Sequence, residues 1–322
     1  MKGVGEILGG IEVKVPKPQP KRSGRSTSEE RAKRLLDAAK ATQNVPTSVL
    51  YQHSILCQTG LPYRNPGNDV RIWKRTNGQA KLQVIAGQAY HPGVNDFVEL
   101  GLPYGPKPRL ILAHLNAEAL RQQSAEIEVE DSLTAFVKRL KLDSGGRTIN
   151  TIKDQLARLA ACSMRFGAAW EGHAITLNAQ IVTAFDLWFP KEEGQRVLWP
   201  STVRLSTEYF DSLAKHAVPL HDRALMALSG SAMALDVYAW LAQRLHRIER
   251  GQRVFVPWSA LKEQFGWHYD RMDHFKEVFR PVIRDVHSQY RAAGIELDGQ
   301  GMNLRHSPPP VKGRIGIVVK VP

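Results

Sequence analysis

One order of helices and strands occurs twice along this chain, between Pro108 and Phe185 and again between Ser231 and Ser307. In each copy the hydrophobic spacing predicts a helix, a short strand, a short helix, a long helix with a basic face and then a β-ribbon. This is the element order of a winged helix-turn-helix, which places its long helix in the DNA major groove. The repetition therefore predicts an α+β fold with two tandem winged-helix modules in a pseudo-symmetric arrangement.

The two copies share element lengths but little sequence. In the first, Asp131 or Ser132 can cap the short helix, and the expected elements are helix 109–121, strand 126–129, helix 133–140, helix 147–163 and ribbon 163–178, with a further strand within 180–187. In the second, Ser259 can cap the short helix, and the expected elements are helix 232–248, strand 253–258, helix 260–265, helix 272–290 and ribbon 295–305. Pro281 should kink or loosen the last long helix.

Composition shifts divide the chain into four parts. Residues 1–46 are expected to form a basic, largely disordered arm with a short helix that begins at Ser28, because proline, small polar residues and positive charge dominate the segment before that helix. Residues 47–200 form an N-terminal winged-helix domain, which includes a β-hairpin with its turn at Asn77-Gly78. Residues 201–311 form a C-terminal winged-helix domain, and residues 312–322 are a tail whose apolar stretch could add an edge strand.

The charge balance favours a polyanionic partner. The chain has 44 Lys and Arg against 31 Asp and Glu, a net charge of +13 over 322 residues, and such a surplus suits nucleic acid or an anionic membrane surface. No apolar run approaches the roughly 20 residues that a membrane-spanning helix needs. Cys57 and Cys162 lie far apart in apolar contexts, which predicts two packed thiols in a reducing cytoplasmic compartment.

The long helices carry the candidate DNA contacts. Arginine and asparagine can read base edges, whereas threonine and lysine more often hold phosphates. In the first module the candidates are Arg147, Asn150, Thr151 and Arg158 on the outward face, Lys153 at its edge and Arg165 on the ribbon. In the second module they are Lys276, Arg280, Arg284 and His287 on the helix and Arg305 on the ribbon. For each helix alone, the plainer interpretation is an ordinary solvated face.

No catalytic constellation is visible in the sequence. A glycine-rich phosphate loop is missing, and no paired-histidine motif accompanies a tyrosine that could nick a strand. His268, Asp270, Asp273 and His274 straddle a turn and a helix start, where capping and solvation suffice to explain them. We therefore expect no enzyme activity, no cofactor and no metal site.

Six longer strings resemble the plasmid-encoded RepA replication initiators of broad-host-range bacterial plasmids. The resemblance covers roughly residues 47–311, and its strings are Gly101–Leu115, Asp131–Val137, Gly146–Ile149, Thr151–Leu159, Phe185–Lys191 and Ala234–Leu245. It implies binding of repeated sites at a replication origin, bending or melting of adjacent DNA, and recruitment of the host replication initiator and helicase. It also implies a homodimer in equilibrium with a monomer, in the bacterial cytoplasm with the plasmid.

Two other function classes remain open from the residues alone. The same modules suit a transcriptional regulator or autorepressor, which would bind palindromic sites where an initiator binds direct repeats. An enzyme acting on DNA would require metal-dependent nicking or nucleotide turnover, for which the sequence gives little support.

Overall fold

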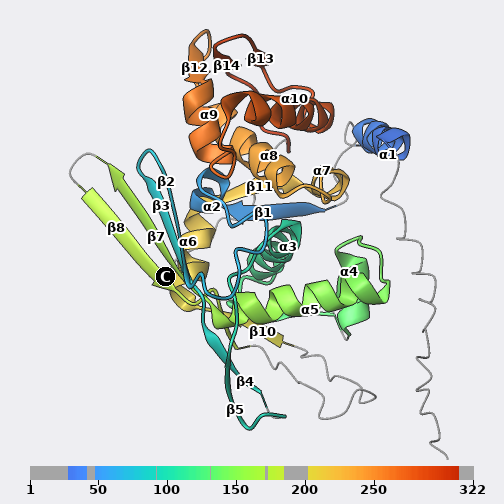
Figure 1. Ribbon diagram of the computed structural model, residues 1–322, viewed down its shortest axis with the longest axis vertical. Helices are drawn as coiled ribbons and strands as arrows, with labels where there is room; N and C mark the ends of the chain where they lie inside the picture. The colour runs from blue at the N-terminus through green and yellow to red at the C-terminus, as the bar shows by residue number, and fades with distance from the viewer. Residues whose placement is uncertain are drawn as a thin grey trace, which may run out of the picture.

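The computed structural model describes residues 28–41, 48–91, 93–130, 132–170, 173–184 and 202–311. The predictions for the arm before residue 28, for the tail after residue 311 and for the end of the strand expected within 180–187 lie outside these ranges. The two predicted helical modules occupy opposite ends of the molecule along its long axis, and a seam of two short strands lies between them (Figure 1).

The elements of the first module are confirmed to within a few residues. They are α3 (Pro106–Gln122), β6 (Glu126–Glu128), α4 (Leu133–Arg139), α5 (Gly146–Ala161), β7 (Ser163–Trp170), β8 (His173–Ala179) and β9 (Val182–Ala184). Of the two cap candidates, Ser132 is described, and its hydroxyl accepts a hydrogen bond from the Ala135 amide at 3.1 Å. On α5 the side chains of Ile152, Leu156 and Leu159 are buried, as their helical spacing predicts.

The second module follows the same order. Its elements are α8 (Ala232–Arg244), η1 (Leu245–Arg247), β12 (Arg253–Pro257), α9 (Trp258–Phe265), α10 (Met272–Gln289), β13 (Ile295–Leu297) and β14 (Gly301–Arg305). The prediction that Ser259 caps the short helix is wrong, because Pro257 takes the cap position and Trp258 is already helical. Helix α10 runs as one element through Pro281.

The predicted hairpin forms and extends a sheet. Strands β2 (Ile72–Asn77) and β3 (Ala80–Ile85) pair so that Asn77 faces Ala80 across the turn. Gly78 has a φ of +55°, which a glycine adopts at little cost. Strand β3 then pairs with β7 and β7 with β8, so the hairpin and the predicted ribbon form one four-stranded sheet, β2-β3-β7-β8. A second hairpin, β4 (Gln88–His91) with β5 (Asp96–Glu99), projects separately beside α5 (Figure 1).

The strand partner of β6 differs from the expectation. The sequence predicts 163–178 as the ribbon of the first module, but β7 of that ribbon pairs with β3. Strand β6 pairs instead with β10 (Thr202–Leu205), which also pairs with β9. The expected division between residues 200 and 201 therefore falls between two strands of one sheet.

The seam between the modules is a strand pair that joins distant parts of the chain. Strand β1 (Val49–His53) runs antiparallel to β11 (Ala217–His221). Each strand leads into a short helix, α2 (Ser54–Gln58) or α7 (Asp222–Ala227), and the last strand residue, His53 or His221, caps that helix by accepting from a backbone amide at 3.2 Å. The same strand-cap-helix unit thus occurs in both halves.

The helices before these strands cross to the opposite half. Helix α1 (Ser28–Ala41) packs on α7 and α10, with Leu35 and Ala39 in the core and the Gln289 amide nitrogen donating to the Leu35 carbonyl at 2.8 Å. Helix α6 (Thr207–His216) packs on β8 and α3, and its Tyr209 and Leu213 are fully buried in the core of the first half. The helix predicted within the N-terminal arm is therefore part of the folded body, because its apolar side is buried against the second module.

Two hydrophobic clusters form the core, one in each half. Cys57 and Cys162 are both buried free thiols, as predicted. Burial raises the pKa of both thiols, to about 12 for Cys162, so both stay protonated and act as apolar packing groups. None of the helices within the described ranges has the length and apolarity that a membrane crossing requires.

Candidate nucleic-acid interface

Helix α5 presents a short polar surface near its N-terminus. Arg147 and Asn150 are exposed, and Lys153 is half-buried. Thr151 is also half-buried, and its hydroxyl donates back to the Arg147 carbonyl at 2.8 Å, which leaves that hydroxyl as an acceptor for an outside donor. Gly145 at the N-cap contributes no side chain, and the Asp143 carboxylate lies beside it, since a Cβ on Gly145 would be 2.9 Å from an Asp143 oxygen.

Arg158 does not belong to this outward surface, which corrects the expectation. Its side chain is only 11% exposed. The guanidinium donates to Asp154 at 2.9 Å and to the Leu102 carbonyl at 3.2 Å, and it lies over the Tyr104 ring. A Cβ on Gly101 would come within 2.3 Å of the same guanidinium. The connector before α3 covers this side of α5, so Arg158 holds the connector and neutralises Asp154.

Arg165 lies in the interior of the four-stranded sheet rather than on a free ribbon. It is exposed on β7, where it pairs in register with Gln83 on β3 and Asn178 on β8. Lys74 pairs with Gln83 in turn, so a cross-strand row of polar side chains carries a cation on two of its four strands. Lys81, exposed on β3, belongs to the same face because it is two residues from Gln83.

Lys74 and Lys81 are not among the contacts predicted from the sequence. The alternation of polar and apolar residues in 70–85 predicts a hairpin with one solvated face, and that signal is present. The pairing of β3 with β7, which aligns this face with Arg165, depends on a contact that local spacing does not encode.

Helix α10 carries the second outward surface. Arg280, Arg284 and His287 are exposed and Lys276 is half-buried. The Lys276 ammonium and the Arg280 guanidinium lie 5.3 Å and 5.2 Å from the centre of the Trp258 ring, an arrangement in which the aromatic face attracts the cations. The indole thus holds two of the predicted DNA contacts side by side.

Arg305, the ribbon candidate, is engaged within its own sheet. Its guanidinium donates to Glu296 at 2.8 Å and its side chain remains 44% exposed. The turn between β13 and β14 is fixed by Asp298, whose carboxylate accepts from the amides of Gln300 and Gly301. These backbone hydrogen bonds lower the pKa of Asp298. The turn therefore presents a carboxylate, whereas Arg305 lies at the far end of β14.

Two contacts fix the hairpin and α3 of the first half against the second module. Arg75 donates to the Gln264 carbonyl at 2.9 Å, at the C-terminal end of α9. Deeper in the seam, Arg109 and Asp236 form a bidentate ion pair at 2.6 and 2.7 Å. The relative placement of α5 and α10 rests on such contacts, so they position the interface without touching DNA.

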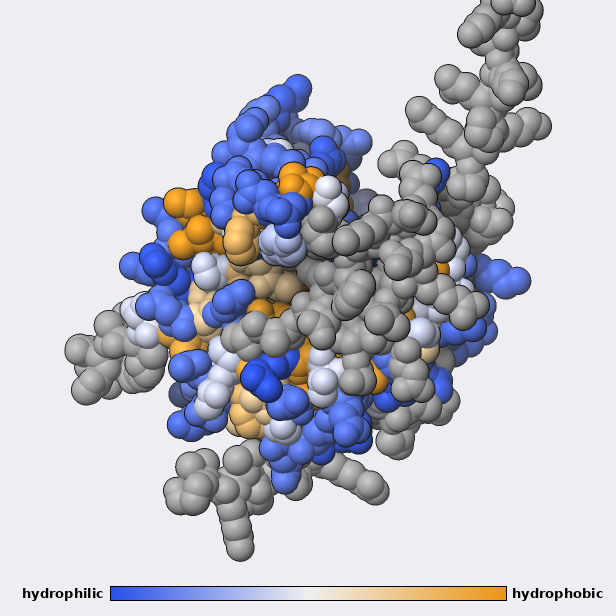
Figure 2. All heavy atoms as spheres, turned by 90° about the horizontal axis from the view of Figure 1, so that it is seen from below, coloured by the Kyte–Doolittle hydropathy of each residue, from blue (hydrophilic) through white to orange (hydrophobic). Residues whose placement is uncertain are grey.

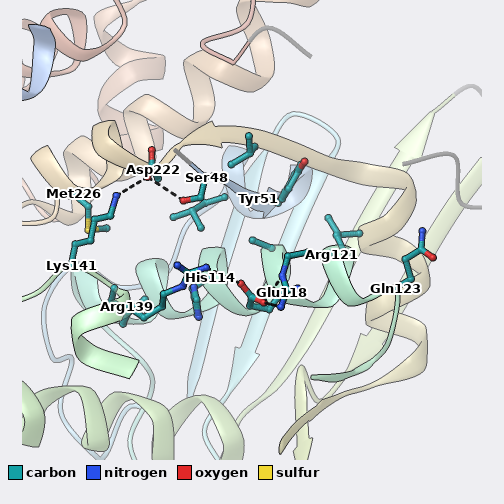
Figure 3. A pocket seen from close by; sticks show the side chains of 15 residues that line it. Ser48, Tyr51, His114, Glu118, Arg121, Gln123, Arg139, Lys141, Asp222 and Met226 are labelled. Atoms are coloured by element: carbon teal, nitrogen blue, oxygen red, sulfur yellow. Dashed lines mark hydrogen bonds and ion pairs between the residues drawn. The ribbon is translucent and has the colours of Figure 1, made fainter. Parts of the chain in front are cut away.

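A cavity of about 530 Å³ lies at the seam, between α3, β1, α7 and the turn after α4 (Figure 3). Across it, Lys141 of that turn contacts Asp222 of α7 at 2.7 Å. On α3, Glu118 accepts hydrogen bonds from Arg121. Burial acts most strongly and raises the pKa of Glu118, but hydrogen bonds from Arg121 and Gln122 and the charges of His114 and Arg121 together outweigh it, so the pKa is lowered. Charges in the lining are thus paired with each other, and the cavity serves as a junction between the halves.

The face nearest α5 is shown in Figure 2, where hydrophilic residues surround more hydrophobic ones over the described surface. The exposed apolar side chains nearest this end are Tyr90, Val94 and Phe97 of the β4-β5 hairpin. Within the described residues, no group of three or more His, Cys, Asp or Glu side chains could hold a metal ion.

Comparison with known proteins identifies a family for part of the chain. Residues 102–259 match the family described as plasmid encoded RepA protein, which confirms the resemblance seen in the sequence strings. No curated protein sequence matches the chain.

Two solved structures of RctB are similar to this chain at low identity. The crystal structure of selenomethionine derivatives of its domains 2 and 3 has a TM-score of 0.49 and 9% identity, covering 79% of this chain and 98% of that one. A crystal structure of RctB domains 2-3 (residues 155–483) has a TM-score of 0.47 and 11% identity, covering 78% and 94%. Both TM-scores are below 0.5, so they establish no shared fold.

Proposed function

Because residues 102–259 of this chain belong to the family of plasmid encoded RepA proteins, we propose that it is a plasmid replication initiator. In this proposal it binds repeated sites at an origin through two winged-helix modules, promotes local melting and recruits host replication proteins. It acts as a DNA-binding protein and not as an enzyme, with the plasmid in the bacterial cytoplasm.

The two sheets support the assignment of winged-helix modules. In the second half the strand order is β12-β14-β13, and in the first half it is β6-β10-β9. In both, the strand that precedes the short helix pairs with the last strand, and the last strand pairs with the one before it. We therefore extend the proposed first module to Leu205, and place the hairpin sheet β2-β3-β7-β8 as an addition to it.

The observation that carries the proposal is the pair of outward basic helices. Among the described residues, no carboxylate forms an ion pair with Arg147 on α5 or with Arg280 and Arg284 on α10, in contrast to Arg158. A solvated face gains from balancing its charges, whereas a phosphate-binding face keeps cations available. One such helix in each module, held in fixed relation by the seam, suits two successive contacts on one duplex.

Fluorescence anisotropy with duplexes tiled across the replicon tests this function. We expect selective binding to a cluster of short direct repeats, with an affinity that falls steeply as salt rises. Arg147→Ala and Arg280→Ala should each weaken specific binding by about 1–3 kcal/mol if the residue reads a base. Arg291→Ala removes an exposed arginine just after α10 and is the matched control.

Different results would point elsewhere. Preference for a lone palindrome would identify a transcriptional regulator, and unchanged affinity in both arginine variants would refute the assignment of α5 and α10. Binding that is equal on all duplexes would show that the modules contact phosphates without reading sequence.

The proposal also includes steps that follow from the family alone. We propose that a dimer and a monomer exchange, and that the host replication initiator and helicase bind the monomer on the origin. Sedimentation of the full chain with and without a single-repeat duplex tests the exchange, because the repeat should shift the population towards one copy per site.

A further inference from the structure

Strand β12 forms an open edge of the second module. In the sheet β12-β14-β13, the part of the chain that the structure describes places no strand beside β12 opposite β14. Its middle residues are Val254, Phe255 and Val256, and Phe255 is 46% exposed. An edge strand presents a row of unpaired backbone donors and acceptors, which another extended chain can extend. Many edges are protected by charge, but the centre of this one is apolar.

A groove follows this edge. Two adjoining hollows of about 390 and 290 Å³ share Arg244 in their lining. The first is bounded by Gln58, Arg247 and Val254, among others. The second lies between the turn of the β2-β3 hairpin and Phe255 on β12. Both halves of the chain thus contribute walls to one continuous surface.

The walls of the groove are fixed by hydrogen bonds. The Asn77 side chain, in the hairpin turn, donates to the Gln58 carbonyl at 3.0 Å. The Gln264 side chain of α9 donates to the same carbonyl at 3.1 Å, and Arg75 ties the hairpin to the Gln264 backbone. A preformed groove loses little conformational entropy when it is filled.

The groove lining contains two arginines, Arg244 and Arg247, and two glutamates, Glu249 and Glu263. Glu249 accepts a hydrogen bond from Gln252 at 3.0 Å, whereas the arginines have no carboxylate partner among the described residues. The Arg244 guanidinium lies 5.6 Å from the centre of the Trp240 ring, and its Nε atom is buried without a hydrogen-bond partner among the described residues. Arg247 is exposed one turn further along, and no ion pair within the described ranges involves either arginine. A half-buried guanidinium with an unused donor favours a carboxylate, which it can bind through two parallel hydrogen bonds.

We propose that the β12 edge and the Arg244 groove bind an extended acidic segment of a partner protein as an added β-strand. The backbone of the segment pairs with β12, its apolar side chains contact Phe255, and its carboxylates meet Arg244 and Arg247. The chain's own tail does not suit this place, since residues 312–322 contain Lys312, Arg314 and Lys320 and no acidic residue. This proposal does not depend on origin binding.

The test uses the full chain without DNA and a fluorescein-labelled octapeptide of alternating aspartate and valine. We expect saturable binding, and slower amide hydrogen exchange over residues 253–257 in the presence of the peptide, because strand addition uses that backbone. Arg244→Gln should weaken binding about tenfold through loss of the charged hydrogen bonds. Phe255→Ser should weaken it as well, while Arg250→Gln, an exposed arginine outside the groove lining, should leave it within about twofold.

The same measurements can overturn the proposal. Equal binding of a lysine-valine octapeptide, no binding of the aspartate peptide, or unchanged exchange of 253–257 would each refute it. Binding of labelled oligothymidine that Arg244→Gln abolishes, with no peptide binding, would assign the groove to single-stranded nucleic acid. If Arg244→Gln lowers the thermal midpoint, its weaker binding could reflect unfolding. Phe255→Ser changes an exposed side chain, so weaker binding by that variant then tests the proposal.

Discussion

The ion pair between Arg109 and Asp236 allows a quantitative test of how the two halves are joined. The Arg109 side chain is 6% exposed and the Asp236 side chain 11%. All five guanidinium N–H groups have acceptors: the two carboxylate oxygens of Asp236 and the carbonyls of Leu61, Pro62 and Gly105. Burial raises the pKa of Asp236, and the guanidinium opposes that rise.

Removing one partner should cost more than removing both. Asp236→Ala leaves a buried guanidinium without its counter-charge, which costs about 3–5 kcal/mol. Arg109→Met leaves the buried carboxylate unpaired at a similar cost, and in addition leaves three carbonyls without a donor, at about 1 kcal/mol or more each. In the double variant the three carbonyls, the Tyr63 hydroxyl that hydrogen-bonds to Asp236 and a small cavity remain. Asp236→Ala should therefore destabilise the natural chain but stabilise the Arg109→Met variant.

Urea unfolding of the four proteins, followed by tryptophan fluorescence and far-ultraviolet circular dichroism, measures this double-mutant cycle. Glu126→Ala is the matched control, because it breaks the exposed pair with Arg204, whose side chains are 59% and 54% exposed, and should cost about 1 kcal/mol or less. If Asp236→Ala destabilises both backgrounds equally, the pair contributes no coupling and the reasoning fails.

Two further predictions concern the same seam. Burial, with a smaller contribution from a neighbouring histidine, lowers the pKa of His53 from 6.5 to about 3, so between these values the unfolded chain binds a proton that the folded chain does not. The unfolding free energy should therefore fall by up to about 1.4 kcal/mol per pH unit below about pH 6. Urea unfolding midpoints measured from pH 8 to pH 5 test this. In the His53→Asn variant the unfolding free energy should depend less steeply on pH. Gly60 has a φ of +79°, and a Cβ there would lie 2.4 Å from an Asp236 oxygen. Gly78 has a φ of +55°, but a Cβ there would have no atom within 4 Å. Gly60→Ala should therefore have a much lower thermal midpoint than Gly78→Ala, and equal midpoints would contradict the contact with Asp236.

The local spacing of apolar and turn residues was sufficient to predict the helices and strands of each module. The helical spacing of apolar residues gives α5 and α10 within two residues at each end, and Asn77-Gly78 predicts the hairpin turn that β2 and β3 form. These signals are local because a helix or hairpin is stabilised by contacts between residues that are near in sequence.

Long-range pairing was not predictable in this way. The Arg204 side chain on β10 contacts Glu126 on β6, 78 residues away, and Ser48 before β1 donates to Asp222 after β11, 174 residues away. A strand of three to five residues can pair with any edge of suitable polarity, so its sequence alone does not determine which strand it pairs with. The crossing of α1 and α6 to opposite halves follows from these pairings, so it was equally hidden.

The contrast between Arg158 and Arg280 shows where such reasoning about a site fails and how it can be improved. Helical periodicity assigns both to outward faces, yet Arg158 is covered by the connector before α3, and Arg280 stays exposed over Trp258. Periodicity gives the direction of a side chain but not the non-helical segment that covers it. One local signal was available, since Asp154 lies four residues before Arg158, the spacing of a helical ion pair. An arginine with an acid four residues before it in the same helix is positioned to pair with that acid, so the helix cations without such a partner are the better candidates for DNA contact.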